Sequence, residues 1–433
     1  MFFFPLWVVL ISVPCVYAAA RYSRSSVATL FASFSFLISG TIVLLSFSRL
    51  TGNAGIAYLN GLFLLQASSL TVLSSVLFLV CSIPFLVYYL PSVDVNRLPK
   101  AAALFHLLIF FALGSFFAAD LLSFTMFFEA VPVLALALVV LEGKVESSPY
   151  DYLLYFVPFP LLLLFTGLAA EGACDLNAIT FQVGATLVLG VVLAARLLLF
   201  PFGWSAVRCL PLSGPAASYA LFSLPAIALF ALLKFLPYSG FLGLTALVLC
   251  ALSMIVWAIL CHRQGKLGNV MLYAYLAQTA TVAVMIVYLM LNVGTEPGAC
   301  LLILGSHLVS GLGLLMCASV DDGKRGRFGN GALVLFAFCM LGLPPSPGFF
   351  GRLMLFKTSL AAADLPAYVL RLSFLVNLFI VYCQSKYLAP VTGRIRTGPK
   401  TPPLLTAALL LLAAYLIAGT VFATQLRNFL INL

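Results

Sequence analysis

Five charged or titratable side chains stand inside long apolar segments of this chain. They are Glu129, Arg196, Lys234, His307 and Arg352. A charge at the centre of a bilayer costs about 3 kcal/mol on insertion scales. Glutamate, lysine and histidine can exchange protons, whereas a guanidinium group keeps its proton in proteins and acts as a fixed charge. The residue types therefore favour a proton or ion path inside a membrane protein.

Each of these residues also has a simpler interpretation. Glu129 could be a neutral acid with a local hydrogen bond, and Lys234 could extend its amine to the membrane surface. His307 could be a core histidine bonded to a neighbouring carbonyl, and this interpretation is stronger still for His106. Arg371 could be another fixed charge or could reach the surface. Both interpretations stay open from the residues alone.

The composition is that of a polytopic membrane protein. Of 433 residues, 64% are hydrophobic and 8% charged, against about 25% charged in soluble proteins. A transmembrane helix needs about 20 apolar residues. We predict an all-α fold with about fourteen such helices, the first of which resembles a signal peptide. The predicted spans are 2–20, 28–48, 62–90, 101–118, 121–141, 152–170, 178–202, 215–236, 240–261, 268–292, 297–319, 330–356, 365–388 and 402–424.

The basic residues predict the orientation of these spans. Of the 22 Lys and Arg residues, 15 fall in loops that follow odd-numbered spans and three in the other loops, while four lie within spans. The positive-inside rule then places both chain termini on the face away from the cytoplasm or matrix. The net charge of +10 is thus a topology signal, and we expect no nucleic-acid partner.

Several kinds of chemistry lack a sequence signature. The ten cysteines are scattered without a CxxC spacing, which argues against a zinc site or an iron–sulfur cluster in this chain. The chain has neither a GxGxxG nor a P-loop pattern, so nucleotide-dependent redox chemistry would take place on another chain.

Two predicted spans are interrupted in a similar way. Arg196 precedes Pro201–Gly203 in the span at 178–202, and Pro344–Gly348 precedes Arg352 in the span at 330–356. Proline removes a backbone donor, so we expect each span to break. Two breaks five spans apart predict inverted five-helix repeats, spans 4–8 and 9–13, with a transport site near the midplane. The predicted segments are 1–100 (three N-terminal helices), 101–236 (first repeat), 240–388 (second repeat) and 389–433 (C-terminal helix).

Short motifs around the charges resemble subunit 4 of the NADH dehydrogenase family, the antiporter-like subunits of respiratory complex I. They occur in the family's order over about residues 59–356. The motifs are Phe127-Phe128-Glu129-Ala130, Leu59-Asn60-Gly61-Leu62 with Asn60 where Asp is usual, Tyr155, Leu232-Leu233-Lys234, Lys266 through Gln278 with Gln278 in place of a histidine, Gly305-Ser306-His307, and Leu341-Gly342-Leu343-Pro344-Pro345.

The resemblance implies a proton-pumping membrane-arm subunit that couples NADH:ubiquinone electron transfer on other subunits to proton transport. Glu129, Lys234 and His307 match the family's span-5 acid, span-8 lysine and span-11 histidine. Arg196 stands where a span-7 lysine is usual, and Arg352 replaces a span-12 glutamate. We expect the two arginines to tune the path as fixed charges. We also expect the other three residues to face one another across a hydrated interior seam.

The resemblance further implies a place in a larger assembly. NADH, FMN, iron–sulfur clusters and ubiquinone would lie on partner subunits, with no cofactor in this chain. The partners would be antiporter-like and accessory complex I subunits, with lipids such as cardiolipin. The location would be the mitochondrial inner membrane, with both termini in the intermembrane space. Three alternatives remain: a stand-alone cation/proton antiporter, the sibling subunit 2 suggested by Gly342–Arg352, or a silent structural subunit.

Overall fold

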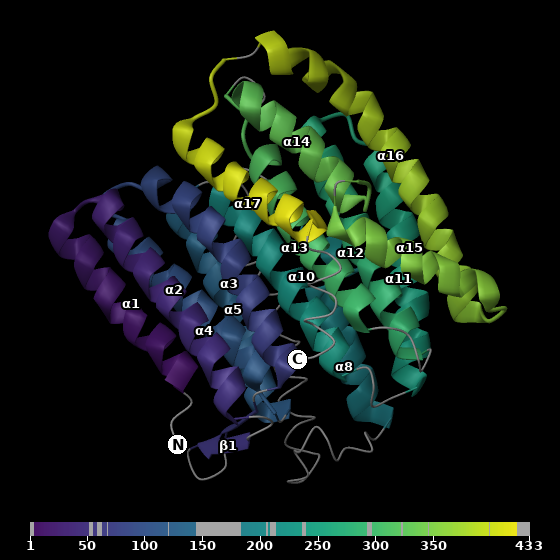
Figure 1. The fold of residues 1–433 in the computed structure, drawn as a ribbon, viewed down its shortest axis with the longest axis horizontal. Helices are drawn as coiled ribbons and strands as arrows, with labels where there is room; N and C mark the ends of the chain where they lie inside the picture. Colours follow the sequence, from purple (N-terminus) through teal and green to yellow (C-terminus); the bar gives the residue numbers. More distant parts are fainter. Residues whose placement is uncertain are drawn as a thin grey trace. The chain divides into compact units, whose positions relative to one another are not determined.

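The computed structural model describes residues 4–51, 55–58, 63–66, 68–119, 121–143, 183–204, 207, 214–235, 240–291, 297–321, 324–344, 346–397 and 399–421 (Figure 1). Internal packing divides the chain into two units, and each is described by itself. The first contains Met1–Val192 and Val207–Pro211, and the second contains Leu193–Ala206 and Leu212–Leu433.

Four contacts between helices build the first unit. Helix α1 packs on α2 and α4, α4 packs on α5, and α3 packs on α2. A short antiparallel hairpin of β1 and β2 contacts α4 and α5. The elements are α1 (Phe4–Ser23), α2 (Ser26–Thr51), β1 (Gly55–Tyr58), β2 (Phe63–Gln66), α3 (Ser69–Tyr89), the 3-10 turn η1 (Leu90–Ser92), α4 (Leu98–Phe117) and α5 (Leu121–Glu142).

The hairpin corrects one predicted boundary. The predicted span at 62–90 is wrong at its start, because Phe63–Gln66 forms a strand and the helix begins only at Ser69. A capping box fixes that start. The Ser68 hydroxyl accepts from the Thr71 amide at 3.3 Å, and the Thr71 hydroxyl accepts from the Ser68 amide at 2.8 Å.

Two buried helices, α10 and α12, form the centre of the second unit. Helix α12 packs against α11, α13 and α16, and α13 packs against α10, α14 and α15. Figure 1 shows the long α16 running beside α11 and α14. The elements are α10 (Pro215–Phe235), α11 (Gly240–His262), α12 (Leu267–Leu291), α13 (Pro297–Ala318), α14 (Gly326–Met340), α15 (Pro347–Ala361), α16 (Leu365–Thr397) and α17 (Pro403–Val421); α8 (Val183–Arg196) ends in this unit.

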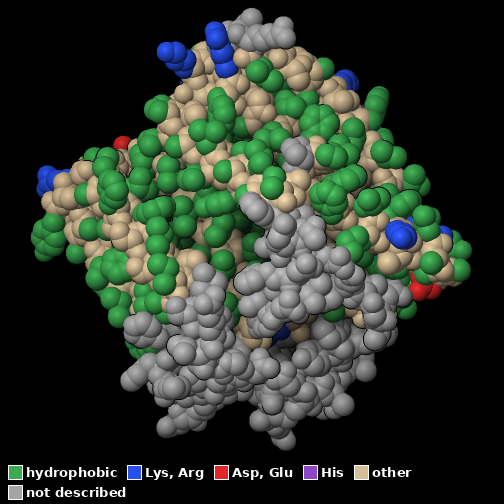
Figure 2. Space-filling view, viewed as in Figure 1, with side chains coloured by type: hydrophobic (Ala, Val, Ile, Leu, Met, Phe, Trp, Pro, Cys, Tyr) green, Lys and Arg blue, Asp and Glu red, His purple; other side chains and the backbone are tan. Residues whose placement is uncertain are grey.

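These helices confirm an all-α polytopic membrane fold, to which the hairpin is a small addition. Eleven described helices are long and apolar enough to cross a membrane. The two interrupted spans correspond to α8 and to the pair α14 and α15, and the predicted span at 152–170 lies outside the described residues. Hydrophobic side chains cover much of the described surface on the face in Figure 2, as lipid contact requires. The four predicted segments stay a prediction.

The broken span at 330–356 forms two half-helices, as the prolines predict. Helix α14 ends in a Schellman motif, in which Leu343 N donates to Phe338 O at 3.1 Å and Gly342 N donates to Cys339 O at 3.0 Å. Gly342 has a φ of 71°, the left-handed conformation that this motif needs. Helix α15 then begins at Pro347. Proline has no backbone N–H, but an N–H at this position would have no partner within the helix.

Helix α8 ends in the same motif. Leu199 N donates to Ala194 O at 2.9 Å and Leu198 N donates to Ala195 O at 3.1 Å, with Leu198 at a φ of 55°. Side chains of α11 bind the freed backbone. The Trp257 indole donates to Leu198 O at 3.1 Å, and the Ser253 hydroxyl accepts from the amide that precedes Pro201 at 3.1 Å. The backbone of this break is therefore satisfied inside the protein, as membrane depth requires.

Candidate functional site

His307 lies in the middle of α13 and is almost completely buried, with 1% of its surface exposed. Its imidazole stacks on the ring of Tyr275 from α12, with centroids 5.5 Å apart and planes 6° apart. Nε2 lies 3.2 Å from the hydroxyl of Thr279, one turn further along α12. We call Tyr275, Thr279 and His307 the His307 cluster.

The hydrogen bonds of this cluster assign the proton of the imidazole. The Thr279 hydroxyl donates to Tyr275 O at 3.0 Å, so its only hydrogen is used there. His307 Nε2 must then be the donor to Thr279, which leaves Nδ1 as a bare acceptor in the neutral ring. Nδ1 is buried and has no hydrogen-bond partner among the described residues. Nδ1 is therefore the one ring nitrogen that can accept a hydrogen bond or a proton.

The polar surroundings of His307 continue toward the broken helix. Ser310 donates to Ser306 O at 2.6 Å, and the Ser306 hydroxyl donates to the hydroxyl of Ser346 at 3.2 Å. Ser346 immediately precedes α15. A side chain at Gly348 would collide with Ser306, since an added Cβ would stand 2.9 Å from its hydroxyl. The close approach of α15 to α13 therefore depends on a glycine at this position.

Arg352 projects from α15 back to the end of α14, where helical carbonyls have no partner in the helix. Nη1 donates to Leu341 O at 2.7 Å, and Nη2 donates to Met340 O at 2.9 Å. The side chain is 5% exposed. A guanidinium at a helix C-terminus is also favoured by the helix dipole. Arg352 thus caps α14 across the break.

An amide pair extends the Arg352 contacts to two more helices. Arg352 Nη2 also donates to Gln278 Oε1 in α12 at 3.1 Å, and Gln278 Nε2 donates to Asn377 Oδ1 in α16. We call Gln278, Arg352 and Asn377 the Arg352 cluster. Gln278 is adjacent to Thr279 in α12, and the bond from Ser306 to Ser346 joins α13 to the start of α15, which carries Arg352. The two clusters therefore form one buried polar region in the second unit.

Lys234 lies in the last turn of the otherwise buried helix α10, one residue before its end. Its side chain is half-buried, whereas Leu232 and Leu233 before it are buried. Helix α10 packs against α12 and α13, and the Tyr275 hydroxyl donates to Leu221 O of α10 at 3.4 Å. A lysine in the last turn also has a favourable interaction with the helix dipole. The structure thus places Lys234 on a helix that contacts the His307 cluster.

Arg196 occupies the last residue of α8, immediately before the Schellman motif, and is 1% exposed. Glu129 lies in α5 of the first unit and is 7% exposed. Both predicted residues are therefore buried in helices, and their function stays a prediction. The expected meeting of Glu129 with Lys234 and His307 stays a prediction, since Glu129 belongs to the other unit.

His106, the weaker candidate, belongs to the packing of the first unit. Its Nδ1 lies 2.7 Å from the hydroxyl of Ser12 in α1. Ser12 donates to Val9 O at 2.5 Å, so the imidazole is the donor in the contact with Ser12. This contact ties α4 to α1, which favours the simpler interpretation of a core histidine.

The uncharged members of the polar region were not predicted as site residues, although one of them occurs in a sequence motif. Gln278, Thr279 and Asn377 are buried and make the bonds that orient His307 and Arg352. The sequence does contain a signal for them. Burying an amide side chain in an apolar span costs free energy unless the amide is hydrogen-bonded, as burying a charge does. No group of three or more His, Cys, Asp or Glu residues suited to a metal occurs in the described ranges.

Comparisons by sequence give no match, since no family model and no curated protein matches the chain. Solved structures do match in fold. A chain in the respiratory complex I from Thermus thermophilus with bound aureothin has a TM-score of 0.75 at 17% identity, and the match covers 98% of this chain and 98% of that one.

Two further complexes contain chains of this fold. In the Mrp complex from Dietzia sp. DQ12-45-1b the TM-score is 0.80 at 13% identity, over 99% of this chain and 96% of that one. In the membrane-bound sulfane sulfur reductase, an archaeal respiratory membrane complex, the TM-score is 0.74 at 17% identity, over 98% and 95%. The chain therefore has, over nearly its whole length, the fold of chains found in these multisubunit complexes.

Proposed function

We propose that this chain is a proton-translocating membrane subunit of a large redox-driven complex of the complex I type. The full-length likeness in fold to chains of a complex I and of an archaeal respiratory complex supports the proposal. The order of the sequence motifs supports it independently. This chain would conduct protons, and its partners would carry the electrons.

The observation that carries the proposal is the state of His307. The imidazole is buried at mid-helix, its Nε2–H is held by Thr279, and its Nδ1 is a bare acceptor. His106 in the first unit also has one buried nitrogen without a described partner, so this state alone does not separate the two residues. His307 differs in lying within the polar region that reaches Arg352 and the broken span. An imidazole with one free nitrogen can accept a proton on one side and release one on the other.

The proposed sequence of events begins at Lys234. Its protonation would be biased by Glu129 and Arg196, and the proton would then move through buried waters to His307 and the broken span. A partner subunit would drive the cycle by stabilising two charge states differently, because an equilibrium shifts only by such a difference. Arg352 would stay protonated throughout and act on the imidazole as a fixed charge.

The finer assignment rests on the motif resemblance alone. It places the chain as subunit 4 in the mitochondrial inner membrane, with both termini in the intermembrane space. NADH, FMN, iron–sulfur clusters and ubiquinone would be bound by partner subunits. The neighbours would be other antiporter-like and accessory subunits of complex I, together with cardiolipin.

The test compares two histidine variants in the assembled complex in liposomes. His307→Ala should lower the number of protons pumped per NADH oxidised by the share that passes through this chain, since proton transfer at a general acid–base group slows about 100-fold or more when the group is lost. His262→Ala is the matched control, because His262 is exposed at the end of α11. Proton uptake is followed with a pH-sensitive acridine dye. An assembled His307→Ala complex that pumps normally would contradict the proposal.

A second candidate function is a cation/proton antiporter subunit, which the TM-score of 0.80 to a chain of an Mrp complex favours. The two candidates differ in what the isolated chain does. An antiporter would exchange sodium ions for protons in liposomes without any electron donor. A complex I subunit would instead purify with a large assembly that oxidises NADH.

A further inference from the structure

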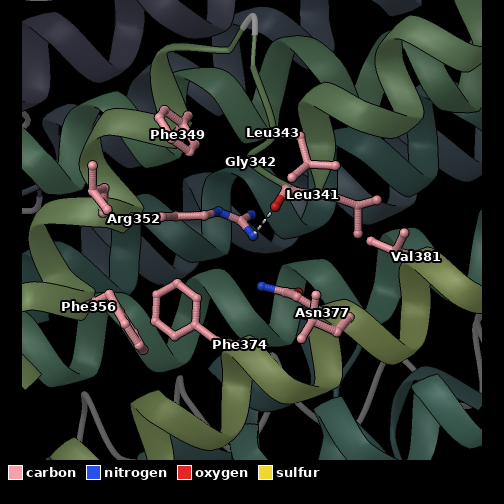
Figure 3. Close-up of a pocket in the computed structure, with 11 residues that line it drawn as sticks. Leu341, Gly342, Leu343, Phe349, Arg352, Phe356, Phe374, Asn377 and Val381 are labelled. Atoms are coloured by element: carbon pink, nitrogen blue, oxygen red, sulfur yellow. Dashed lines mark hydrogen bonds between the residues drawn. The ribbon is translucent and has the colours of Figure 1, made fainter. Parts of the chain in front are cut away.

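A cavity of about 300 Å³ lies between α15, α16 and the break after α14. This volume is at the lower end of the range for small-molecule sites. The cavity is partly open, and Leu353 and Leu378 on its wall are 53% and 66% exposed. The rest of the wall is apolar except for Arg352 and Asn377. The cavity thus combines an apolar opening at two exposed leucines with a polar end, where Figure 3 shows Arg352 and Asn377.

The polar end presents hydrogen-bond donors without matching acceptors. Arg352 Nε is buried and has no partner among the described residues. Nη1 carries two N–H groups and makes one bond, to Leu341 O. Hydrogen bonds to Leu341, Met340 and Gln278 fix the orientation of the guanidinium.

Asn377 adds a second donor. Arg352 needs an acceptor from Gln278, so the Gln278 oxygen faces Arg352 and its nitrogen faces the Asn377 oxygen. The Asn377 nitrogen is then left over, and Figure 3 shows it pointing toward the middle of the cavity. A ligand at this end must therefore be an acceptor.

The charge at this end has no counter-ion. The hydrogen-bond partners of Arg352 are two carbonyls and one amide oxygen, all neutral. No ion pair joins Arg352 to an acidic residue in the described part of the chain. A cation at membrane depth is costly unless it is paired. An anionic acceptor would both use the free donors and neutralise the charge.

We propose that this cavity binds a long-chain fatty acid. Its carboxylate would bind Arg352 and Asn377, and its alkyl chain would leave between Leu353 and Leu378. A single chain fits the volume better than a phospholipid with two chains. A carboxylate, which only accepts hydrogen bonds, matches a polar end that only donates them.

The experiment uses the full chain in its detergent-solubilised complex and two photoreactive probes. One is palmitic acid with a diazirine in mid-chain, and the other is the corresponding fatty alcohol. Cross-linked peptides are located by mass spectrometry. The acid should label α15 and α16 at the cavity about tenfold more than the alcohol, the factor expected from one charge-assisted hydrogen bond.

Two pairs of variants test the tail and the head separately. Leu378→Trp should fill the opening and lower labelling by the acid at least about fivefold, since the tail loses its path. Leu375→Trp is the matched control, because Leu375 is 64% exposed on the same helix and does not line the cavity. Asn377→Asp should also lower labelling by the acid but not by the alcohol, since it provides a fixed anion.

Three results would overturn the proposal. Equal labelling by the acid and the alcohol would show that the head group is not recognised. Equal loss in Leu378→Trp and Leu375→Trp would show that the probe samples the general lipid surface of α16. Full competition by phosphatidylcholine at the same concentration would show a site for ordinary bilayer lipid.

Discussion

Replacing Arg352 distinguishes a capping residue from a residue that tunes a proton path. Its three hydrogen bonds go to Leu341 O, Met340 O and Gln278 Oε1 at 2.7, 2.9 and 3.1 Å. Bonds to a charged group contribute about 1.5–3 kcal/mol each, or roughly 5–9 kcal/mol in all. The cost of burying the charge at membrane depth, about 3 kcal/mol, reduces this stabilisation. Arg352→Met should therefore lower the free energy of unfolding by about 2–6 kcal/mol.

Arg352→Lys is the informative second variant. Lysine keeps the charge but lacks the planar fork that reaches two carbonyls and an amide together. If the residue only supplies a fixed charge to His307, lysine should replace it with little loss. If the residue caps α14, lysine should destabilise the protein about as much as methionine, because it keeps the cost of the charge and loses most of the bonds.

Thermal unfolding of the full chain in detergent measures the effect, at roughly 2–4 °C per kcal/mol for a unit of this size. Lys357→Met is the control, because Lys357 is exposed on the same helix and should change stability by less than about 0.5 kcal/mol. The capping argument fails if Arg352→Lys melts with the wild type while Arg352→Met does not.

Three further substitutions test the breaks and the helix ends by the same measurement. Gly342→Ala should lower the free energy of unfolding by more than about 2 kcal/mol, because its φ is 71° and the added Cβ would stand 2.3 Å from the side chain of Arg352. Gly331→Ala is the control: its Cβ meets no atom within 4 Å, and it should raise the free energy of unfolding by about 0.5–1 kcal/mol. Trp257→Phe should cost about 1–2 kcal/mol, since the carbonyl of Leu198 loses its donor; no change would refute the indole as a support of this break. Thr401→Val should lower the free energy of unfolding by about 1 kcal/mol, since its hydroxyl accepts from an amide in the first turn of α14 at 2.9 Å. A matching loss in Thr406→Val, whose hydroxyl bonds only to the carbonyl of Pro402 just before its own helix, would argue against this end cap.

Hydropathy and proline placement predicted most of the fold. The long apolar helices come from runs that no globular core would require, so composition alone indicates them. The break before α15 follows from Pro344 and Pro347, because neither can donate a helical hydrogen bond. The end of α8 was harder to predict. The helix stops at Arg196, well before Pro201, because Leu198 adopts a left-handed conformation that its residue type does not indicate.

The hairpin of β1 and β2 was not predicted for a related reason. Phe63–Gln66 is as apolar as the helix that follows, so the hydropathy does not separate strand from span. The local signal was polar: Ser68 and Thr71 have the spacing of a capping box and mark the true start of α3. Boundaries in such a chain are better predicted from capping residues than from apolar content.

The partners of the buried charges could not be predicted, because they come from distant parts of the chain. Arg352 was expected to act on the path, and its bonds to the end of α14 depend on the return of the chain after the break. Gln278 was noticed only as a substitution for a histidine. Its function as the link between Arg352 and Asn377 requires three helices to meet, which no local pattern specifies.

Arg352 belongs to a series of arginines that cap consecutive helices of the second unit. Arg325 donates from Nε to Cys317 O and from Nη2 to Val320 O, both at 2.8 Å, at the end of α13. Arg371 donates to Ser359 O at 3.0 Å at the end of α15. Each arginine follows the end of the helix that it caps by 7 to 12 residues. Their common physical basis is the set of carbonyls that every helix end leaves without a partner.

This series changes how buried charges in the chain are to be interpreted. A membrane protein with interrupted helices has helix ends at depth, and arginine satisfies several carbonyls there without ever losing its charge. A buried arginine near such an end therefore has a structural explanation before any functional one. His307 has no such explanation, because it lies in the middle of α13, where every carbonyl has its helical partner. Its Nδ1 binds no described residue and caps no helix. We therefore propose that proton transfer in the second unit depends on His307. The arginines keep their charge and hold the helix ends that surround it.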